Sequence, residues 1–375
     1  MIKKIKILQL KDVNFPIVPQ PLKNELFSSW IVRTAYAHKT HPHTFENLYL
    51  DLPQKLFSKD IDISIDKETI QRVQNKCRDK VNIFSLTMQT YDTYLQEKVI
   101  PNGFNKFITA LKYCPQCLKE DKIPYFRKEW KVIFSTICFQ HHCFLYNSCP
   151  HCKSTLDISK MYNNKLPYTH CYKCGFNLKK SKKLSIHHTH KDNIQNIKKL
   201  FSILKCGYIK LNTVPIYSFY FFDGITQLSK IILTQKCFKT IEDYIPFRVL
   251  KKWKKQKYHS SSPAYTQLPI KEQFILYGSI LKLFNNYPYQ IKSFIFSNRL
   301  TYWKTLKDMR YVSFWFDNLI NSITPRYIST TQLITSKEIA NAKQYLLSKS
   351  VPVTKANLTR LLGCNFFSSY NKLKV

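Results

Sequence analysis

Acidic residues are scarce in this sequence, and their scarcity limits the chemistry that the chain can perform. Its 375 residues include 23 Asp and Glu against 59 Lys and Arg, which gives a formal net charge of +36. The acidic residues are scattered, whereas transposases and many nucleases need a cluster of carboxylates around two metal ions. We therefore expect a protein that is not an enzyme.

Glycine and long apolar runs are also lacking. The six glycines form no G-x-x-x-x-G-K-[ST] motif, which excludes an ordinary P-loop ATPase. The apolar run from Val214 to Phe222 is too short to span a membrane and ends at Asp223. Lysines at positions 3, 4 and 6 interrupt the start of the chain, so we expect no signal peptide, no membrane association and a cytoplasmic location.

The excess of positive charge points to a polyanionic partner. Clustered Lys and Arg displace counterions from nucleic acid and steer its encounter with the protein, although an anionic membrane surface or an acidic protein would also suit this charge. The most basic stretch is Val249 to Tyr258, with five lysines around Trp253. It is either an ordinary solvated helix face or a surface that follows phosphates. The candidate contacts to double-stranded DNA in this stretch are Lys251, Lys252, Lys254 and Lys255.

The cysteines concentrate in one short block. Four of the twelve are scattered and suit buried apolar positions, whereas eight fall between Cys114 and Cys174. In a reducing compartment such spacing favours metal ligands over disulfides. The candidate ligands are Cys114, Cys117, Cys138 and His141 for one ion, and Cys149, Cys152, Cys171 and Cys174 for a second.

This spacing predicts two structural zinc ions. Each C-x2-C or C-x2-H turn supplies two ligands and two turns complete a tetrahedron, which leaves no open position for catalysis. The short separation between His141 and Cys149 favours consecutive modules over crossed pairing. Four neighbours could substitute for a ligand but improve on none of the chosen pairs: His142, Cys143, His151 and His170.

The remaining pattern predicts a mainly α protein with a small β-containing tandem zinc-binding module. We expect a helix over about 25–38 capped by Asn24, a loop through Pro42 and Pro53, a helix over 66–80, and another loop through Pro101 and Gly103. The predicted divisions are an N-terminal helical part (1–112), the zinc-binding module (113–178), a basic linker (179–193), a helical domain (194–335) and a helix-turn-helix region (336–375).

The last forty residues predict DNA binding. Ser336 begins a helix with Ile339, Ala342 and Leu346 facing inward, and Thr354 caps a second helix that ends before Gly363. A third helix from about Asn365 would enter the major groove. The candidate base or phosphate contacts are Arg360, Ser368, Ser369, Asn371 and Lys372. The alternative is an ordinary terminal helical hairpin.

Several motifs occur together in the cysteine block. YCPQCLKED begins at Tyr113 and is followed by Pro124-Tyr125, Arg127 and Trp130, then by Cys138-x2-His141, Leu145 and Cys149-Pro-x-Cys152. This segment resembles the core of the TniQ/TnsD family of transposon target-selection proteins. ELFSSWIVRTA from Glu25 resembles the opening helix of that family, and Leu283–Pro288 followed by Phe294 resembles a later element.

The resemblance implies a function and partners. It implies that residues 1–112 are the helical part of a TniQ-like domain and that the protein recruits an AAA+ regulator and a transposase to an insertion site. The target would be read directly or through a guide-RNA effector complex, and an oligomer is compatible with either. We expect Tyr125 and Trp130 to fill the core of the zinc-binding module, and Arg127 to pair with Asp121 or contact phosphate. The alternatives are a zinc-containing transcription regulator and a zinc-containing nuclease.

Overall fold

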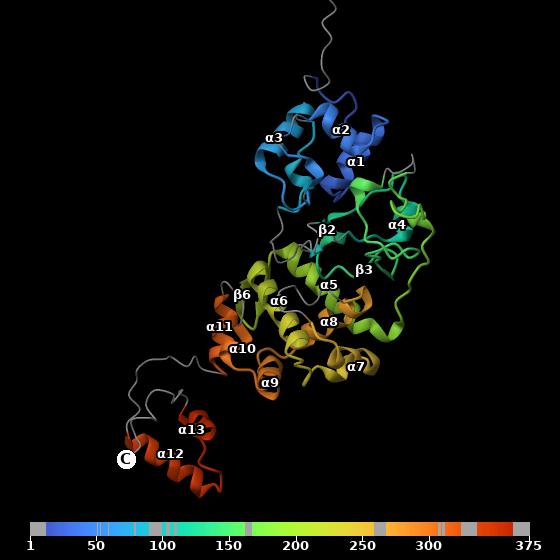
Figure 1. The fold of residues 1–375 in the computed structure, drawn as a ribbon. Helices are drawn as coiled ribbons and strands as arrows, with labels where there is room; N and C mark the ends of the chain where they lie inside the picture. Colours follow the sequence, from blue (N-terminus) through green and yellow to red (C-terminus); the bar gives the residue numbers. More distant parts are fainter. Residues whose placement is uncertain are drawn as a thin grey trace, which may run out of the picture. The chain divides into compact units, whose positions relative to one another are not determined.

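The computed structural model describes residues 13–50, 52, 54–58, 60–78, 80–89, 100–102, 106–108, 111–161, 167–258, 268–306, 309, 312–323 and 336–362. The chain forms two compact units, Met1–Tyr287 and Pro288–Val375. Helices predominate, and the described strands form only two-stranded antiparallel sheets (Figure 1). Within this described part, no helix has both the length and the apolar content that a membrane span requires.

The N-terminal helices are α1 (Phe27–Ala37), α2 (Pro42–Tyr49) and α3 (Lys67–Lys76). The core of α1 includes Phe27 and Trp30, whose rings stack with centroids 6.3 Å apart. The side chain of Asp66 caps α3 by accepting a hydrogen bond from the Thr69 amide at 2.7 Å. As predicted, Ile70 and Val73 on this helix are buried.

The cysteine-rich module, residues 113–178, has little regular structure. It contains α4 (Pro115–Glu120) and a short ribbon of β3 (Ile137–Cys138) and β4 (Cys143–Phe144). A second hairpin, β1 (Ile100–Asn102) with β2 (Lys106–Ile108), precedes the module. The described 3₁₀ turns are η2 (Leu56–Ser58), η3 (Phe84–Leu86), η4 (Lys128–Lys131), η5 (Ile158–Lys160), η7 (Leu178–Lys180), η8 (His188–His190) and η9 (Glu242–Tyr244).

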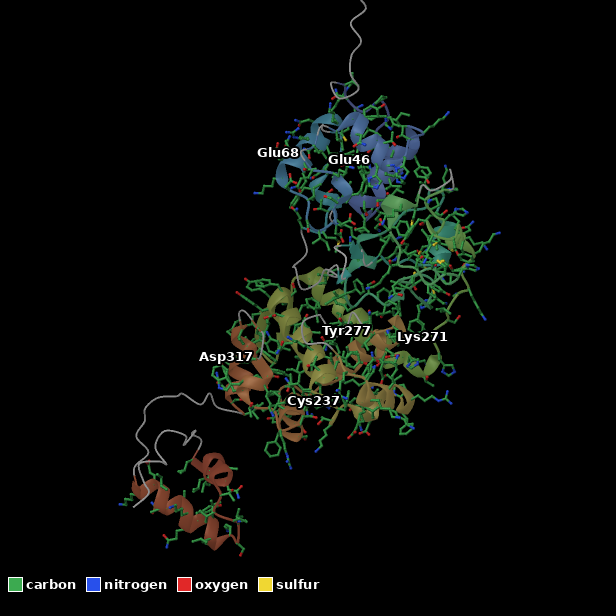
Figure 2. All side chains as sticks on the ribbon, viewed as in Figure 1. Glu46, Glu68, Cys237, Lys271, Tyr277 and Asp317 are labelled. Carbon is green, nitrogen blue, oxygen red and sulfur yellow. The ribbon has the colours of Figure 1, made fainter. Side chains whose placement is uncertain are left out.

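A second helical group follows the module within the first unit. It comprises α5 (Lys191–Cys206), β5 (Tyr208–Leu211), β6 (Val214–Tyr217), α6 (Ser218–Thr234), α7 (Phe247–Lys255) and α8 (Ile270–Lys282). Phe134 of the module inserts here, because its ring stacks on Phe222 of α6 at 5.2 Å and meets Phe201 of α5 edge-on at 5.0 Å. Tyr277 of α8 is buried in this group (Figure 2). The module therefore shares a core with α5, α6 and α8.

The second unit contains α9 (Tyr289–Ser297), α10 (Tyr302–Leu306), α11 (Phe314–Asn321), α12 (Ser336–Ser348) and α13 (Lys355–Leu362). Tyr302 of α10 donates a hydrogen bond from Oη to Oδ1 of Asp317 on α11 at 2.8 Å. Helices α12 and α13 pack around Ile339, Ala342, Leu346 and Leu358. The predicted inward face of α12 is confirmed.

Four sequence predictions of local structure were wrong. Asn24 is not a helix cap: its φ is +55°, and α1 begins after Leu26 without a side-chain cap. Pro42 lies at the start of α2 rather than in a loop, because its missing N–H costs nothing in the first turn. Pro101 lies in β1, which is one strand of a short hairpin. The helical domain predicted for 194–335 also contains a hairpin, because the run from Val214 to Phe222 is split between β6 and α6.

Candidate metal centres and basic surface

The structure brings the eight predicted ligand side chains together in the predicted two groups. The first cluster is Cys114, Cys117, Cys138 and His141, and the second cluster is Cys149, Cys152, Cys171 and Cys174. In each cluster the four candidate ligand atoms lie within 4.8 Å of one another. The pairing is consecutive rather than crossed, as the spacing predicted.

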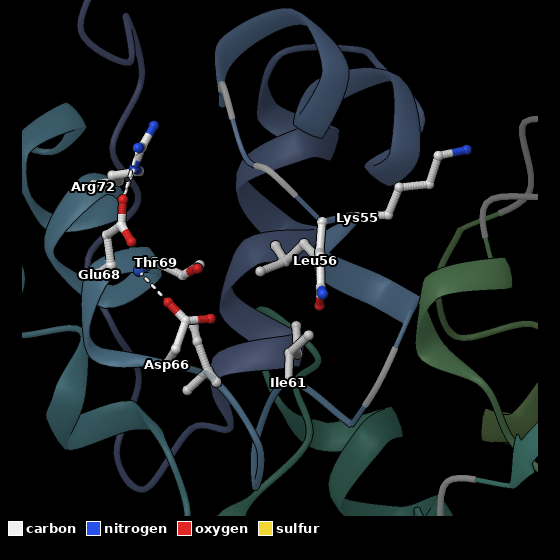
Figure 3. Close-up of a pocket in the computed structure, with 9 residues that line it drawn as sticks. Lys55, Leu56, Ile61, Asp66, Glu68, Thr69 and Arg72 are labelled. Carbon is white, nitrogen blue, oxygen red and sulfur yellow. Dashed lines mark hydrogen bonds and ion pairs between the residues drawn. The ribbon is translucent and has the colours of Figure 1, made fainter.

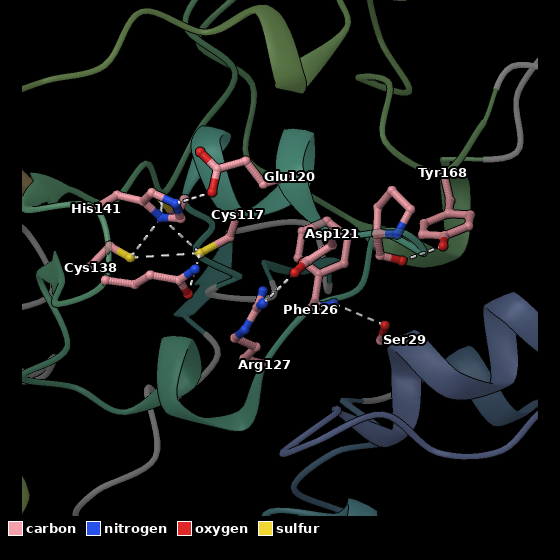
Figure 4. Close-up of polar contacts among 12 residues, drawn as sticks. Ser29, Cys117, Glu120, Asp121, Phe126, Arg127, Cys138, His141 and Tyr168 are labelled. Carbon is pink, nitrogen blue, oxygen red and sulfur yellow. Dashed lines mark hydrogen bonds and ion pairs between the residues drawn. The ribbon is translucent and has the colours of Figure 1, made fainter.

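The separations between the donor atoms fit a tetrahedral ion. A zinc ion with Zn–S bonds of about 2.3 Å requires sulfur atoms about 3.8 Å apart. The Sγ atoms of Cys117 and Cys138 are 3.7 Å apart in the first cluster, and those of Cys149 and Cys174 are 3.7 Å apart in the second. His141 directs Nδ1 at the thiols, 3.2 Å from Cys117 Sγ (Figure 4). Both donor sets therefore have the chemistry and the spacing that zinc requires.

Tight backbone turns hold the second cluster. The amide of Lys153 donates to the carbonyl of Cys149 at 2.9 Å, and the amide of Gly175 donates to the carbonyl of Cys171 at 2.8 Å. Lys153 and Gly175 have φ of +60° and +70°, respectively. Only glycine adopts this left-handed conformation without cost, so Gly175 suits its turn and Lys153 is strained. These matching turns place two thiols from each Cys-x2-Cys pair toward one centre.

The first cluster is built differently on one side. Cys114 is the N-cap residue of α4 and Pro115 occupies its first turn, so Cys117 lies within the helix. The opposing turn, Cys138-x2-His141, is followed by His142 with φ of +48°. This cluster thus combines a helix start with one tight turn.

Glu120 completes the surroundings of His141 and was not predicted from the sequence. Its Oε2 lies 2.7 Å from Nε2 of His141, on the ring nitrogen that faces away from the thiols (Figure 4). A carboxylate at this position accepts the Nε2–H and leaves Nδ1 free to bind a metal. The sequence did contain the information for this contact, because Glu120 follows Cys117 by three residues and so lies on the same face of α4.

Cys143 lies beside the first cluster but is not one of its four members. Its buried Sγ is 3.6 Å from Sγ of Cys114. Cys143 pairs with Cys138 across the β3–β4 ribbon, which brings it near. The other three neighbours considered from the sequence, His142, His151 and His170, are not in either group.

An ion pair and aromatic rings support the first cluster. Arg127 donates from Nη2 to Oδ1 of Asp121 at 2.8 Å, and its guanidinium lies 4.2 Å from the ring centroid of Tyr125. Burial lowers the pKa of the Arg127 guanidinium, but the hydrogen bond to Asp121 and the negative charge around it together raise that pKa. Trp130 is buried and Tyr125 is half-buried. The structure thus shows the ion pair, one of the two roles considered for Arg127.

Buried charges connect the module to the N-terminal helices. Lys131 is 1% exposed, and its Nζ contacts Oδ1 of Asp60 at 2.5 Å and Oδ2 of Asp62 at 2.8 Å. Asp62 also accepts hydrogen bonds from the amide and hydroxyl of Ser28 on α1. Burial alone would lower the pKa of Lys131, but the two carboxylates raise it. The charge of Lys131 is therefore retained inside the protein.

A second connection uses Glu25 and Ser29. The fully buried Glu25 pairs with Arg33 at 2.7 Å and accepts a hydrogen bond from the Ser29 hydroxyl at 3.0 Å. Ser29 Oγ in turn accepts from the amide of Phe126 at 3.0 Å (Figure 4). The N-terminal helices and the first cluster thus form one continuous structure.

The sequence model of the TniQ family matches residues 16–145. This range contains α1 to α3, the buried connections and the first cluster. Residues 16–145 are therefore a TniQ domain. A comparison with curated proteins gives no match.

A TniQ domain implies a function associated with transposition. The domain match ends at Leu145, so the second cluster lies outside it. Tyr113 connects the TniQ domain to the residues that follow it, because its backbone pairs with Tyr146 and its Oη lies 2.8 Å from the hydroxyl of Ser181 in the predicted basic linker. Residues of the predicted basic linker also lie against the module, since Phe144 donates its amide to the carbonyl of Leu184 at 2.9 Å.

The TniQ domain also contains a small pocket of about 160 Å³. Leu56, Ile61 and Ile65 line it, together with Asp66 and polar residues of α3 (Figure 3). Its acidic groups are already engaged: Asp66 caps α3, and Glu68 on that helix pairs with Arg72 at 2.7 Å. Both acidic side chains of this pocket therefore already have partners on α3.

The predicted basic surface lies on α7, outside the TniQ domain. Trp253 is buried and donates from Nε1 to Oε2 of Glu272 on α8 at 2.7 Å, which anchors the helix.

Two of the predicted lysine contacts on α7 already have acidic partners. Lys252 pairs with the other oxygen of Glu272 at 2.6 Å, and Lys254 lies 3.6 Å from Glu242. The remaining two predicted contacts, Lys251 and Lys255, are exposed and form no ion pair within the described residues. The basic surface of α7 therefore consists of these four lysines, two of them partly neutralised.

The C-terminal prediction falls partly outside the described residues. Helix α13 spans the predicted second helix, and the Thr354 hydroxyl accepts from the Asn357 amide at 3.2 Å, which confirms the predicted cap. Arg360 lies in α13. The third helix and its candidate contacts, Ser368, Ser369, Asn371 and Lys372, lie outside the described residues. A helix-turn-helix unit therefore stays a prediction.

Proposed function

We propose that this protein is a DNA-binding adaptor that selects the target site of a transposon and recruits an AAA+ regulator and a transposase to it. The observation that carries the proposal is the TniQ domain, in which the first cluster and the N-terminal helices form one structure. The net charge of +36 supports nucleic acid as the partner.

The proposal includes two structural zinc ions. Cys114, Cys117, Cys138 and His141 would hold one, and Cys149, Cys152, Cys171 and Cys174 would hold the other. Four protein ligands saturate a tetrahedral zinc, so each ion would stabilise the fold and activate no water. In a module with so little regular structure, the free energy of metal binding is also folding free energy.

The distribution of acidic groups supports a role without phosphoryl-transfer chemistry. Among the residues that the structure describes, only the two cysteine clusters bring three or more potential metal ligands together. Neither cluster contains a carboxylate. The buried carboxylates of Asp60 and Asp62 are bound to Lys131. Strand transfer and ATP hydrolysis are then the work of partners.

We assign DNA contact to two regions. The basic surface of α7 would contact phosphates, since its lysines point to solvent while Trp253 fixes the helix. The C-terminal helices would supply base contacts through Arg360 and the four residues Ser368, Ser369, Asn371 and Lys372. Replacing Asn371 with Ala should then reduce discrimination between sequences more than it reduces non-specific binding.

The AAA+ regulator would bind the TniQ domain, because the motifs that define the family lie there. The target would be read directly by this protein or through a guide-RNA effector complex. Binding to duplex DNA alone would also suit a transcription regulator. The test is therefore a pull-down with a transposon AAA+ ATPase and its transposase. Binding through the TniQ domain supports the adaptor, and DNA binding without ATPase binding favours the regulator.

A further inference from the structure

The hairpin of β5 and β6 carries a continuous exposed face of aromatic side chains. Tyr208 and Tyr217 are direct cross-strand partners, so their side chains lie on the same face of the ribbon. They are 46% and 64% exposed, respectively. Next to them at the start of α6, Phe219 and Tyr220 are each 39% exposed. These four residues are the aromatic hairpin face.

The rings on this face are ordered. The ring planes of Tyr217 and Phe219 are 11° apart with centroids separated by 5.7 Å, and the Phe219 and Tyr220 centroids are 4.1 Å apart. The opposite face of the ribbon holds Ile209 and Ile216, which are buried. The buried face fixes the register of the two strands, and the register in turn fixes which aromatic side chains face solvent.

The positive charge around the aromatic hairpin face favours a polyanionic partner. No acidic residue occurs between Asp192 and Asp223, a segment that contains α5 after its first turn and all of β5 and β6. Lys205 and Lys210 are exposed, and Lys210 lies on the same face of β5 as Tyr208. Parallel rings with lysines beside them are the combination that single-stranded nucleic acid uses, because bases stack on the rings while phosphates contact the lysines.

Two features make a protein partner a poorer fit. Pro215 in β6 has no backbone N–H to donate, which makes the ribbon a weaker template for an added strand. Lysine is also depleted from the centres of protein–protein interfaces, whereas Lys210 lies among the exposed residues of this face.

We propose that the aromatic hairpin face binds unpaired bases of single-stranded DNA. The inference rests on the proposed DNA-binding function and extends it, because it gives the protein a site for an opened strand beside its contacts to duplex. Tyr217 is the central residue, since it is the most exposed of the four and stacks on Phe219.

The experiment measures binding of the full-length, zinc-loaded chain to fluorescent oligothymidylate and to a duplex of equal length. Base stacking contributes about 1 to 3 kcal/mol per base, so Tyr217→Ser should weaken single-strand binding by about 5-fold to 150-fold. Duplex binding should stay unchanged, and Tyr217→Trp should retain single-strand binding. The matched control is Tyr289→Ser, because Tyr289 is similarly exposed at 70% but lies in the second unit.

A photo-cross-link locates the site independently of any variant. A single strand containing 5-iodouracil should form an adduct with Tyr208 or within Tyr217–Tyr220. Unchanged binding after Tyr217→Ser, an equal loss on duplex DNA, or adducts confined to other peptides would overturn the proposal. Stronger binding of single-stranded RNA through Tyr217 would assign the site to RNA, and loss of AAA+ ATPase binding alone would assign it to protein; either result contradicts the DNA assignment.

The same measurements separate this inference from the proposed function. Failure of the proposed function appears as duplex binding that does not depend on the lysines of α7 and as absence of ATPase recruitment. Failure of the inference appears only in the single-strand response to Tyr217→Ser.

Discussion

Glu120 accepts a hydrogen bond from Nε2 of His141 at 2.7 Å, while Nδ1 of the same ring faces the thiols of the first cluster. The two residues are 21 positions apart in sequence, and α4 and the turn after β3 bring them together. The carboxylate fixes the orientation and tautomer of the imidazole. The first cluster therefore has an outer support that the second cluster, made of four thiols, does not require.

Removing that support should loosen metal binding at the first cluster alone. Outer-shell partners of this kind typically affect metal affinity by about 10- to 100-fold. We expect Glu120→Ala to lose one of two zinc ions faster to a chelator by about that factor, and Glu120→Gln to lose it less quickly. The measurement is zinc release followed with a chromogenic chelator. Glu129→Ala is the control, because Glu129 lies in the same domain but accepts a hydrogen bond from Asn24 rather than from His141. Equal release from all variants would contradict the role of Glu120.

The zinc content itself is the second prediction. The purified protein should contain two zinc ions per chain by elemental analysis, and Cys114→Ser should remove one of them and unfold the first part of the module. His187→Ala should leave the count at two, because His187 belongs to neither cluster. A wild-type content of one ion or none would refute the assignment.

The cysteine spacing predicted the two clusters because each pair is local: a turn of four residues fixes where both donors point. The outer partners depend on tertiary contacts instead. Glu120 reaches His141 only after β3 and β4 fold back toward α4, and Lys131 reaches Asp60 across 71 positions. Sequence reasoning also missed the β5–β6 hairpin, since its apolar residues continue into α6 without a break in composition.

Lys131→Met should strongly destabilise the first unit. The substitution leaves Asp60 and Asp62 buried without their cation, which typically costs about 3 to 5 kcal/mol. Because the pKa of Lys131 is raised in the fold, its contribution is complete below about pH 10.4 and is lost as the pH rises through the higher, folded-state pKa.

Urea unfolding at neutral pH measures this effect. Lys119→Met is the control, because Lys119 is exposed on α4. An equal midpoint for the two variants would show that the buried ion pairs do not hold the N-terminal helices to the module.

Salt dependence tests the basic surface of α7. Each lysine that neutralises a phosphate contributes about 0.9 to the slope of log affinity against log salt concentration. We expect Lys251→Gln with Lys255→Gln to flatten the slope for duplex DNA by about 2. Lys252→Gln with Lys254→Gln should flatten it less, because Glu272 and Glu242 already pair with those lysines. An unchanged slope in both double variants would show that these lysines are ordinary solvent-exposed side chains that do not contact DNA.

The most direct test of the account is reconstituted transposition with this protein, the AAA+ ATPase, the transposase and donor and target DNA. We predict insertion at a defined site only when this protein is present, and no DNA cleavage by this protein alone in Mg²⁺ or Mn²⁺. The contradicting result is reproducible nicking by the purified chain that disappears after one Asp or Glu substitution, or the same distribution of insertions with and without the protein.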